Sequence, residues 1–376
     1  MRVLLPFLAA LALLGAILLS LWRRRLRPRA PAAHPRSAAP TATPAPPVPP
    51  VVARAPTAAA LESAPRPAVE PIAPAAPTPE DAQRQFDALA FGVPQLGPFP
   101  PPEHGRVVNA VLAALEDAVH QSRHLPRRPS IVPELLRATQ DEASSRREIA
   151  AIIARDPALA ADLLRMANSA LYRVSPQPVE SIDRAVSLLG TQGLRSLVAA
   201  AILQPMFRTP AGQFERFPQF TWDHAVLSGH AAETLAALAE NEDPFAAQLL
   251  ALLVALGRIV VFRVALEQYA ADPALRPSPE ALALLVERQC APVARRIAAG
   301  WELSERLVTA LNDQSAPAAV NMSPLGRSIH LGRLLGTLAL LAREGRTDPG
   351  AAQALARAAG VPPRLLERMW PRLTRS

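Results

Sequence analysis

The sequence predicts an all-α fold for the region that follows residue 79, and three observations support this. Apolar residues recur there at intervals of three and four, as in Val107, Val111 and Leu115, which is the spacing of one helix face. Combinations of a capping residue and Pro that start helices, such as Thr78-Pro79, recur along the chain. No segment has the alternation of apolar and polar residues that a half-buried strand requires.

Composition separates a packed part of the chain from an unpacked part. The 376 residues are 50% hydrophobic, but they include 42 Pro and only 4% aromatic residues, so part of the chain is not expected to pack. All 40 basic residues are Arg, and nine of them but only three acidic residues precede Asp81. A nucleic-acid-binding domain usually has its excess positive charge on the folded part, so no nucleic-acid partner is expected. Cys290 is the only cysteine, which excludes an intrachain disulfide.

The N-terminus has the features of a membrane anchor. Val3–Trp22 is a 20-residue run without charge, which is long enough to cross a hydrocarbon core of ~30 Å as one helix. Five Arg follow in Arg23–Arg29, and positive charge on this side predicts that the C-terminal part stays in the cytoplasm. A cleaved signal peptide is the alternative, but it requires a shorter apolar core followed by small residues. Residues 1–27 are therefore interpreted as a single-pass anchor, with lipid in contact with Val3–Trp22 and Arg23–Arg29.

Residues 28–79 have the composition of an extended spacer. They contain 16 Pro among Ala, Ser, Thr and Val, which favours polyproline II geometry and cannot form a core. At ~3.1 Å per residue, full extension would give a reach of about 160 Å. A ligand for SH3-like domains is the alternative. Thr78-Pro79, with acidic residues next, predicts a helix start, and a helical lead-in is expected over residues 80–124.

Short helices are expected through the rest of the chain. Ser181 is the predicted N-cap of a helix that Gly190 ends, and Thr191 opens a longer one. The later amphipathic or buried segments are Thr221–Glu240, Pro244–Ala265, Pro279–Gln289, one or two helical turns before Trp301, Ser304–Asn312 and Pro324–Arg343. Residues 315–376 are expected to supply helices that pack on the domain or extend it, and an exposed oligomerisation face is the alternative for the last two.

Asn168 and Ser169 are two adjacent polar residues in the last turn of a predicted helix. Leu159 and Leu163 belong to the apolar face of that helix, and Asn168 lies just beside this face. A buried Asn must form hydrogen bonds, or it costs about 1–3 kcal/mol. Its structural use would be to bind backbone groups of the next segment, where Ser175-Pro176-Gln177-Pro178 predicts a loop. Its functional use would be to recognise a partner.

Three segments of the chain closely resemble the first half of an HDOD domain: LPRRPSIVPELLRA, EIAAIIARDPALAADLLRMANSALYRV and SIDRAVSLLGTQGLRSLVAAAIL. The shared residues, in the order and at the spacing of the family, are Asp156-Pro157, Asn168-Ser169, Ser181-Ile182, Ala185 and Leu189-Gly190. The resemblance covers residues 125–314 and is stronger before Leu203 than after it. It implies a multi-helical domain that is related to the HD phosphohydrolases, is regarded as having lost their metal-dependent catalysis, and acts in bacterial signalling.

Residues of other types stand where HD phosphohydrolases have metal ligands. Catalysis of that kind requires several His and Asp side chains on one or two metal ions. Where relatives often read LLHDIG, this chain reads LLVALG, which puts Val254 and Ala255 in the places of the histidine and the aspartate. Cys290 stands where relatives often have a His, and Asn312-Asp313 stand where a His pair is common. Apolar side chains cannot bind a metal.

His224 and His230 remain on one predicted helix, but at six residues apart they point about 120° from each other. His224 is interpreted as a packed, hydrogen-bonded core residue, and Cys290 as a small buried hydrophobe. We therefore expect no catalytic residue, no metal and no cofactor.

The sequence predicts a non-catalytic signal-transduction module at the bacterial inner membrane that binds an unidentified signalling protein. The candidate partner-binding residues, in the cleft between the two helical halves, are Asp156, Asn168, Ser169, Tyr172 and His224. Two alternatives stay open. One is a metal-dependent nucleotide phosphodiesterase or phosphohydrolase with an atypical site, and the other is a nucleotide sensor without hydrolysis, for example of cyclic di-GMP. The sequence does not define the oligomeric state.

Overall fold

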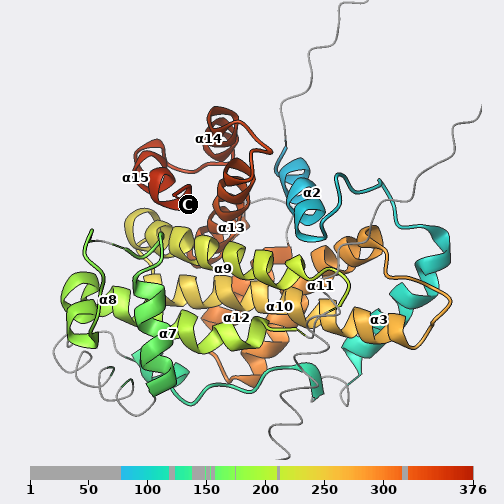
Figure 1. The fold of residues 1–376 in the computed structure, drawn as a ribbon, viewed down its shortest axis with the longest axis horizontal. Helices are drawn as coiled ribbons and strands as arrows, with labels where there is room; N and C mark the ends of the chain where they lie inside the picture. Colours follow the sequence, from blue (N-terminus) through green and yellow to red (C-terminus); the bar gives the residue numbers. More distant parts are fainter. Residues whose placement is uncertain are drawn as a thin grey trace, which may run out of the picture. The chain divides into compact units, whose positions relative to one another are not determined.

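The regular structure is entirely helical in the residues that the computed structural model describes, which are 78–117, 123–137, 149, 153, 157–173, 175–209, 212–315 and 321–375. This confirms the all-α prediction. The expected anchor Val3–Trp22, its flank Arg23–Arg29 and the linker before residue 78 lie outside the described residues. In chain order the α-helices are α2 (Pro79–Ala90), α3 (Gly105–Glu116), α5 (Val132–Arg137), α7 (Pro157–Ala167), α8 (Ile182–Leu203), α9 (Arg216–Leu235), α10 (Pro244–Ala270), α11 (Pro279–Gly300), α12 (Glu305–Asn312), α13 (Pro324–Arg343), α14 (Pro349–Ala358) and α15 (Pro363–Leu373) (Figure 1).

Side-chain caps start the helices at the predicted residues. At α2, the Thr78 hydroxyl accepts a hydrogen bond from the Asp81 N–H (3.1 Å), and the Asp81 carboxylate accepts one from the Thr78 N–H (3.0 Å). At α8, the Ser181 hydroxyl accepts from the Arg184 N–H at 3.2 Å. These bonds satisfy N–H groups that the first turn of a helix leaves without partners. Both helix starts are confirmed.

Gly190 divides α8 into two helical segments. Its φ of 67° and ψ of −179° are not helical, and a residue with a Cβ rarely adopts this backbone conformation. The break confirms the predicted change of helix at Gly190. The second segment then presents Leu194 and Leu197 to the core, where neither is exposed.

Three helix boundaries differ from the prediction: α10 continues five residues beyond Ala265, to Ala270, and at the other two packing outweighs the local signals. α9 begins before Thr221, since Phe217 is fully buried and extends the apolar face towards the N-terminus. α11 does not end at Gln289 but continues through Pro292, although a Pro inside a helix removes one backbone hydrogen bond. Its buried face continues through Ile297 against α10, and this contact offsets the loss.

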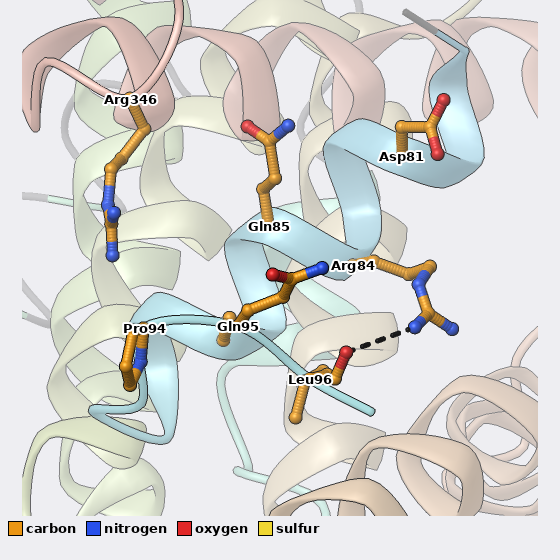
Figure 2. A pocket seen from close by; sticks show the side chains of 8 residues that line it. Asp81, Arg84, Gln85, Pro94, Gln95, Leu96 and Arg346 are labelled. Carbon is orange, nitrogen blue, oxygen red and sulfur yellow. Dashed lines mark hydrogen bonds between the residues drawn. The ribbon is translucent and has the colours of Figure 1, made fainter. Parts of the chain in front are cut away.

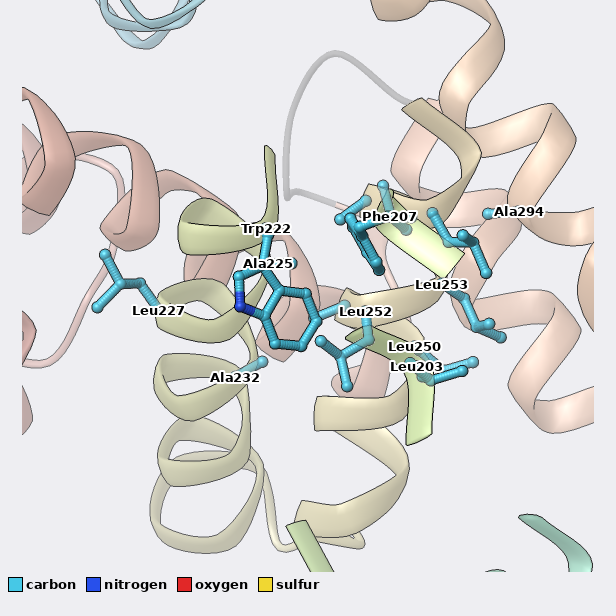
Figure 3. Packing of buried hydrophobic residues seen from close by; sticks show 14 of the residues in the cluster. Leu203, Phe207, Trp222, Ala225, Leu227, Ala232, Leu250, Leu252, Leu253 and Ala294 are labelled. Atoms are coloured by element: carbon cyan, nitrogen blue, oxygen red, sulfur yellow. The ribbon is translucent and has the colours of Figure 1, made fainter. Parts of the chain in front are cut away.

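α10 is the central helix of the described part of the chain. It is apolar on all sides and contacts α3, α8, α9, α11 and α13. Figure 3 shows Trp222 of α9 among the buried side chains of α10, near Phe207, whose ring centroid lies 5.0 Å from that of Trp222. By length and composition alone, α10 and the segment Arg184–Phe207 could each cross a membrane. However, 89% of the most apolar window of α10 is buried inside the protein, which is typical of a core helix.

Two glycines bring α9 and α13 into close contact. A Cβ on Gly332 would lie 2.7 Å from the Ala232 nitrogen, and a Cβ on Gly336 would lie 3.0 Å from the Ser228 nitrogen. Only Gly allows the two backbones to approach this closely. The close packing places His224, one turn before Ser228, directly against α13.

The first and last described helices belong to the same folded unit as the helices between them. α2 contacts α9, α11 and α13, and its Phe86 is fully buried. α14 and α15 lie beside α13 and α9 (Figure 1), where Ala352 and Leu366 are fully buried. Residues of α2 and of α15 therefore line cavities of this unit together with residues of the chain between them.

Candidate functional site

Val254 and Ala255 lie in the middle of α10 and are 1% and 3% exposed. Their neighbours Leu253 and Leu256 are also fully buried. The part of α10 that the sequence resemblance aligns with the histidine and aspartate of HD phosphohydrolases is therefore packed into an apolar core. It offers a metal ion no donor atom from these two side chains.

One turn further along α10, Arg258 forms the centre of a buried group of side chains. Its guanidinium pairs with the Asp87 carboxylate of α2, and the two residues are 2% and 3% exposed. The aromatic rings of Phe86 and Phe217 flank the guanidinium, with centroids 5.2 and 5.8 Å from its central carbon. We define the Arg258 cluster as Phe86, Asp87, His224, Arg258 and Arg333.

His224 is the histidine of this cluster, and its side chain is 3% exposed. Its Nε2 lies 3.1 Å from the Arg333 carbonyl oxygen and 3.0 Å from the Thr337 hydroxyl, both on α13. Burial and the charges of Arg258 and Arg333 lower the pKa of His224 to about 3, so the ring is neutral at pH 7. The interpretation of His224 as a packed, hydrogen-bonded core residue is confirmed. In this conformation the side chain is not at the surface, and so it cannot contact a partner directly.

The residues around Arg258 do not fit a catalytic metal. The strongest charges next to His224 are guanidinium cations, which repel a metal cation, and the one carboxylate, Asp87, is already paired with Arg258. Within the described ranges, no group of three or more His, Cys, Asp or Glu side chains is arranged to hold a metal ion.

Cys290 and Asn312-Asp313 are the other positions at which the resemblance leads one to expect histidines, and here they serve packing and the start of a helix. Cys290 is 2% exposed, as expected of a small buried hydrophobe. Asn312 accepts a hydrogen bond from Arg295 at 3.0 Å. The Asp313 carboxylate accepts bonds from the Ser323 N–H (2.9 Å) and hydroxyl (2.6 Å), and so it fixes the N-cap of α13.

Asn168 joins the end of α7 to the loop that precedes α8. Its side-chain amide donates to the Val179 carbonyl (2.8 Å) and to the Leu164 carbonyl (2.9 Å), and its oxygen accepts from the Val179 N–H at 2.7 Å. The two bonds to Val179 satisfy both backbone groups of that residue, which is 5% exposed. The structural use proposed for Asn168 is thus present, and its role in partner binding stays a prediction.

We expect Asn168→Ala to lower the free energy of unfolding by about 1–3 kcal/mol, because it leaves the backbone groups of Val179 without partners. Urea denaturation followed by circular dichroism measures this loss. Ser169→Ala is the matched control, because Ser169 is adjacent and exposed, and its unfolding midpoint should equal that of the wild type. Equal midpoints for both variants would contradict the structural role.

Ser169 and Tyr172 lie together at a groove between α7 and α9, with a volume of about 280 Å³. Ser169 is exposed, whereas Tyr172 is 7% exposed and its hydroxyl accepts a bond from Gln248 at 3.4 Å. Asp156 lies outside the described residues. We call this cavity the Ser169 groove, and the residues that line it are Arg165, Met166, Ser169, Ala170, Leu171, Tyr172, Gln204, Trp222, Asp223, Val226, Leu227 and Arg343.

The far wall of the Ser169 groove consists of residues that the sequence did not single out. Asp223 accepts a hydrogen bond from Gln219 at 2.8 Å. Burial raises the pKa of Asp223 above its usual value, although this bond and the charge of Arg343 lower it in part. Arg343 comes from the end of α13, outside the segment that resembles the family. No sequence pattern pairs it with Asp223, so only the folded structure reveals this side of the groove.

A larger cavity of about 570 Å³ lies beside α2 (Figure 2). Two of its polar residues, Asp81 and Arg84, already have structural roles. Asp81 is part of the capping box, and Arg84 donates to the carbonyl oxygens of Leu96 (3.3 Å) and Gly97 (2.9 Å). These contacts fix the loop after α2, and none of the candidate residues lies here.

Comparisons with known proteins assign the family. A model of the HDOD domain matches residues 125–317, and no curated protein gave a match. Similar solved structures include a "Putative metal-dependent phosphohydrolase" from Shewanella amazonensis SB2B, with TM-score 0.48 and 19% identity over 71% of this chain and 98% of that one. A "Putative phosphohydrolase" from the same organism has TM-score 0.44 and 24% identity over 69% and 98%. An HDOD domain protein of unknown function from Geobacter sulfurreducens has TM-score 0.42 and 16% identity over 78% and 96%. Because the family model covers half of the 376 residues, this protein belongs to the HDOD domain family.

Proposed function

We propose that this chain is a non-catalytic signal-transduction module, tethered to the inner membrane, that binds another protein through the Ser169 groove. The main support is the Arg258 cluster. It puts a buried guanidinium one helical turn from Val254 and Ala255, the α10 positions that the resemblance assigns to metal ligands of HD phosphohydrolases. A domain built this way retains the HD-like fold but has no use for a metal cation at that place.

The composition of the Ser169 groove resembles that of a protein–protein contact. Apolar side chains such as Val226 and Leu227 lie beside the charged Arg165, Asp223 and Arg343. Interfaces commonly combine an apolar centre with a polar rim that includes Arg. The groove has room for one or two partner side chains, and Ser169 lies at its exposed edge.

The proposed anchor explains how a small contact would suffice. Residues 1–27 would hold the domain near the membrane through the linker, which raises the effective concentration of the groove towards membrane-bound partners. A groove of this size gives weak binding by itself, since affinity depends on how many well-packed residues are buried.

Photocrosslinking in intact cells tests this proposal. A photoreactive amino acid at Ser169 of the full-length chain should give a discrete protein adduct, at least tenfold stronger than one placed at Glu287. Glu287 is the control because it is exposed on α11 and far from the groove in sequence. Deletion of residues 1–27 should weaken the adduct. Equal labelling from both positions would contradict a partner site in the Ser169 groove.

A further inference from the structure

A separate cavity of about 230 Å³ lies where α15 packs against α9. We call it the Glu233 pocket, and it is lined by Gln192, His230, Glu233, Thr234, Ala237, Leu238, Pro244, Arg368, Met369 and Arg372. α15 follows the last residue of the HDOD match. One wall of this pocket is therefore supplied by a helix that is not part of the family domain.

Glu233 is held in place through one carboxylate oxygen. Its Oε1 accepts hydrogen bonds from the Ser196 hydroxyl (3.0 Å) and from the Gln192 amide (3.5 Å), both on α8. Among the described residues, the contact recorded for its Oε2 is with His230 Nδ1 at 3.9 Å, which is too long for a good hydrogen bond. The side chain is 16% exposed. One oxygen of an oriented carboxylate thus has capacity to accept hydrogen bonds from a ligand.

Arg368 and Arg372 supply positive charge at the opposite wall. They are four residues apart on α15, so they share one face of the helix. Met369 and Leu373, at 2% and 0% exposure, anchor that helix in the core, while both Arg side chains are exposed. Neither Arg forms an ion pair or a hydrogen bond to another described residue. Two unpaired guanidinium groups on one face are suited to bind a phosphate through forked hydrogen bonds.

We propose that the Glu233 pocket binds a guanine nucleotide, whose base donates N1–H and N2–H to the available Oε2 of Glu233 and whose phosphate binds Arg368 and Arg372. An ionised carboxylate is a pure acceptor, so it matches the two adjacent donors of guanine and is repelled by the N1 acceptor of adenine. The volume of the Glu233 pocket, about 230 Å³, is below the roughly 300 Å³ at which sites for drug-sized ligands begin. The pocket therefore encloses a single base, with the phosphate at the mouth. This site is independent of the Ser169 groove and of the proposed partner.

The protonation state of Glu233 gives the proposal a pH dependence. Burial raises the pKa of Glu233 to about 7, although the hydrogen bonds from Ser196 and Gln192 lower it in part. Guanine binding requires the ionised form, so the affinity for GMP should rise between pH 6 and pH 8. The charged or titratable groups that face Glu233 are His230 on α9, Arg195 on α8, Tyr172 after α7, Asp243 before α10, and Arg368 and Arg372 on α15.

Isothermal titration of the full-length protein with GMP at pH 8 tests the site. Saturable binding is expected, at least tenfold tighter than binding of AMP, guanosine or inorganic phosphate, because each of these lacks part of the match. Glu233→Gln should abolish the preference for GMP over AMP, and the double variant Arg368→Ala/Arg372→Ala should weaken GMP binding at least tenfold. Arg357→Ala, which removes an exposed charge from the neighbouring α14, should leave the affinity within twofold of the wild type.

Three results would overturn the proposal: no GMP binding at millimolar concentration, equal binding of GMP and AMP to the wild type, or GMP binding that neither set of pocket variants changes. Circular dichroism and the thermal midpoint of each variant verify folding. GMP should also raise the Tm of the wild type and of Arg357→Ala but not that of Arg368→Ala/Arg372→Ala, because a ligand stabilises only the form that binds it.

Discussion

Asp87→Ala is expected to lower the free energy of unfolding by about 3–5 kcal/mol, because it leaves the buried Arg258 charge without its partner. Arg258 is 2% exposed, and its Nε already lacks a hydrogen-bond partner. The aromatic rings of Phe86 and Phe217 that flank the guanidinium provide only partial compensation. Urea denaturation of the full-length protein measures the loss.

Two further variants separate the buried ion pair from the general effect of changing α2. Glu80→Ala removes a carboxylate from the same helix at an exposed position, and its unfolding midpoint should match that of the wild type. Asp87→Leu combined with Arg258→Met should recover most of the lost stability, because replacing a whole buried ion pair by apolar groups is often neutral. A wild-type midpoint for Asp87→Ala would show that α2 does not depend on this contact.

Cys290 provides a second measurement on the same variant. It is the only cysteine, it is 2% exposed, and α11, which bears it, contacts α2. Loosening of α2 in Asp87→Ala should therefore accelerate reaction of the Cys290 thiol with a thiol reagent in the absence of urea. Unchanged thiol reactivity together with lower stability would place the damage elsewhere in the core.

The pH dependence of stability should change in opposite directions in two variants. The pKa of His224 is about 3 in the folded protein and 6.5 in the unfolded chain. Below pH 6.5 only the unfolded chain takes up this proton, so the free energy of unfolding falls as the pH drops from 6.5 towards 3, by up to ~1.4 kcal/mol per pH unit. His224→Gln should remove this loss and make stability between pH 6.5 and pH 5 less dependent on pH.

Glu233→Gln should have the reverse effect. Burial raises the pKa of Glu233 to about 7, against 4.5 in the unfolded chain. Between these values only the folded protein binds the proton, so Glu233 adds stability as the pH falls from 7 to 4.5. The variant removes this gain, and its stability should drop more steeply with acid than that of the wild type. Parallel pH profiles of urea midpoints for both variants and the wild type would contradict these protonation states.

Local signals in the sequence were enough for most of the fold. Thr78 and Ser181 start helices through bonds to residues three positions away, and Gly190 breaks a helix through its own backbone conformation. Such features depend only on near neighbours and can be predicted without a fold. The continuation of α11 through Pro292 depends on contacts with α10, and for that reason the prediction divided this helix into a segment that ends at Gln289 and separate turns before Trp301.

The candidate site was predictable only in part, because its contacts join residues far apart in the chain. The sequence indicated that Val254 and Ala255 replace metal ligands, and that His224 packs in the core. It gave no indication that Arg258 pairs with Asp87, because all basic residues of this chain are Arg and none stands out. The opposite wall of the Ser169 groove was missed for a similar reason, since Arg343 comes from the C-terminal helices.

The metal content of the full-length protein tests the central proposal that the α10 region around Val254, Ala255 and Arg258 does not support metal-dependent catalysis. The chain would be produced in medium supplemented with Fe, Mn and Zn, purified in detergent without chelators, and analysed by inductively coupled plasma mass spectrometry. The Arg258 cluster, with Val254 and Ala255 beside it, predicts far less than one ion per chain. One or two tightly held ions per chain, lost together with a phosphohydrolase activity on chelation, would contradict the account and establish the hydrolase alternative.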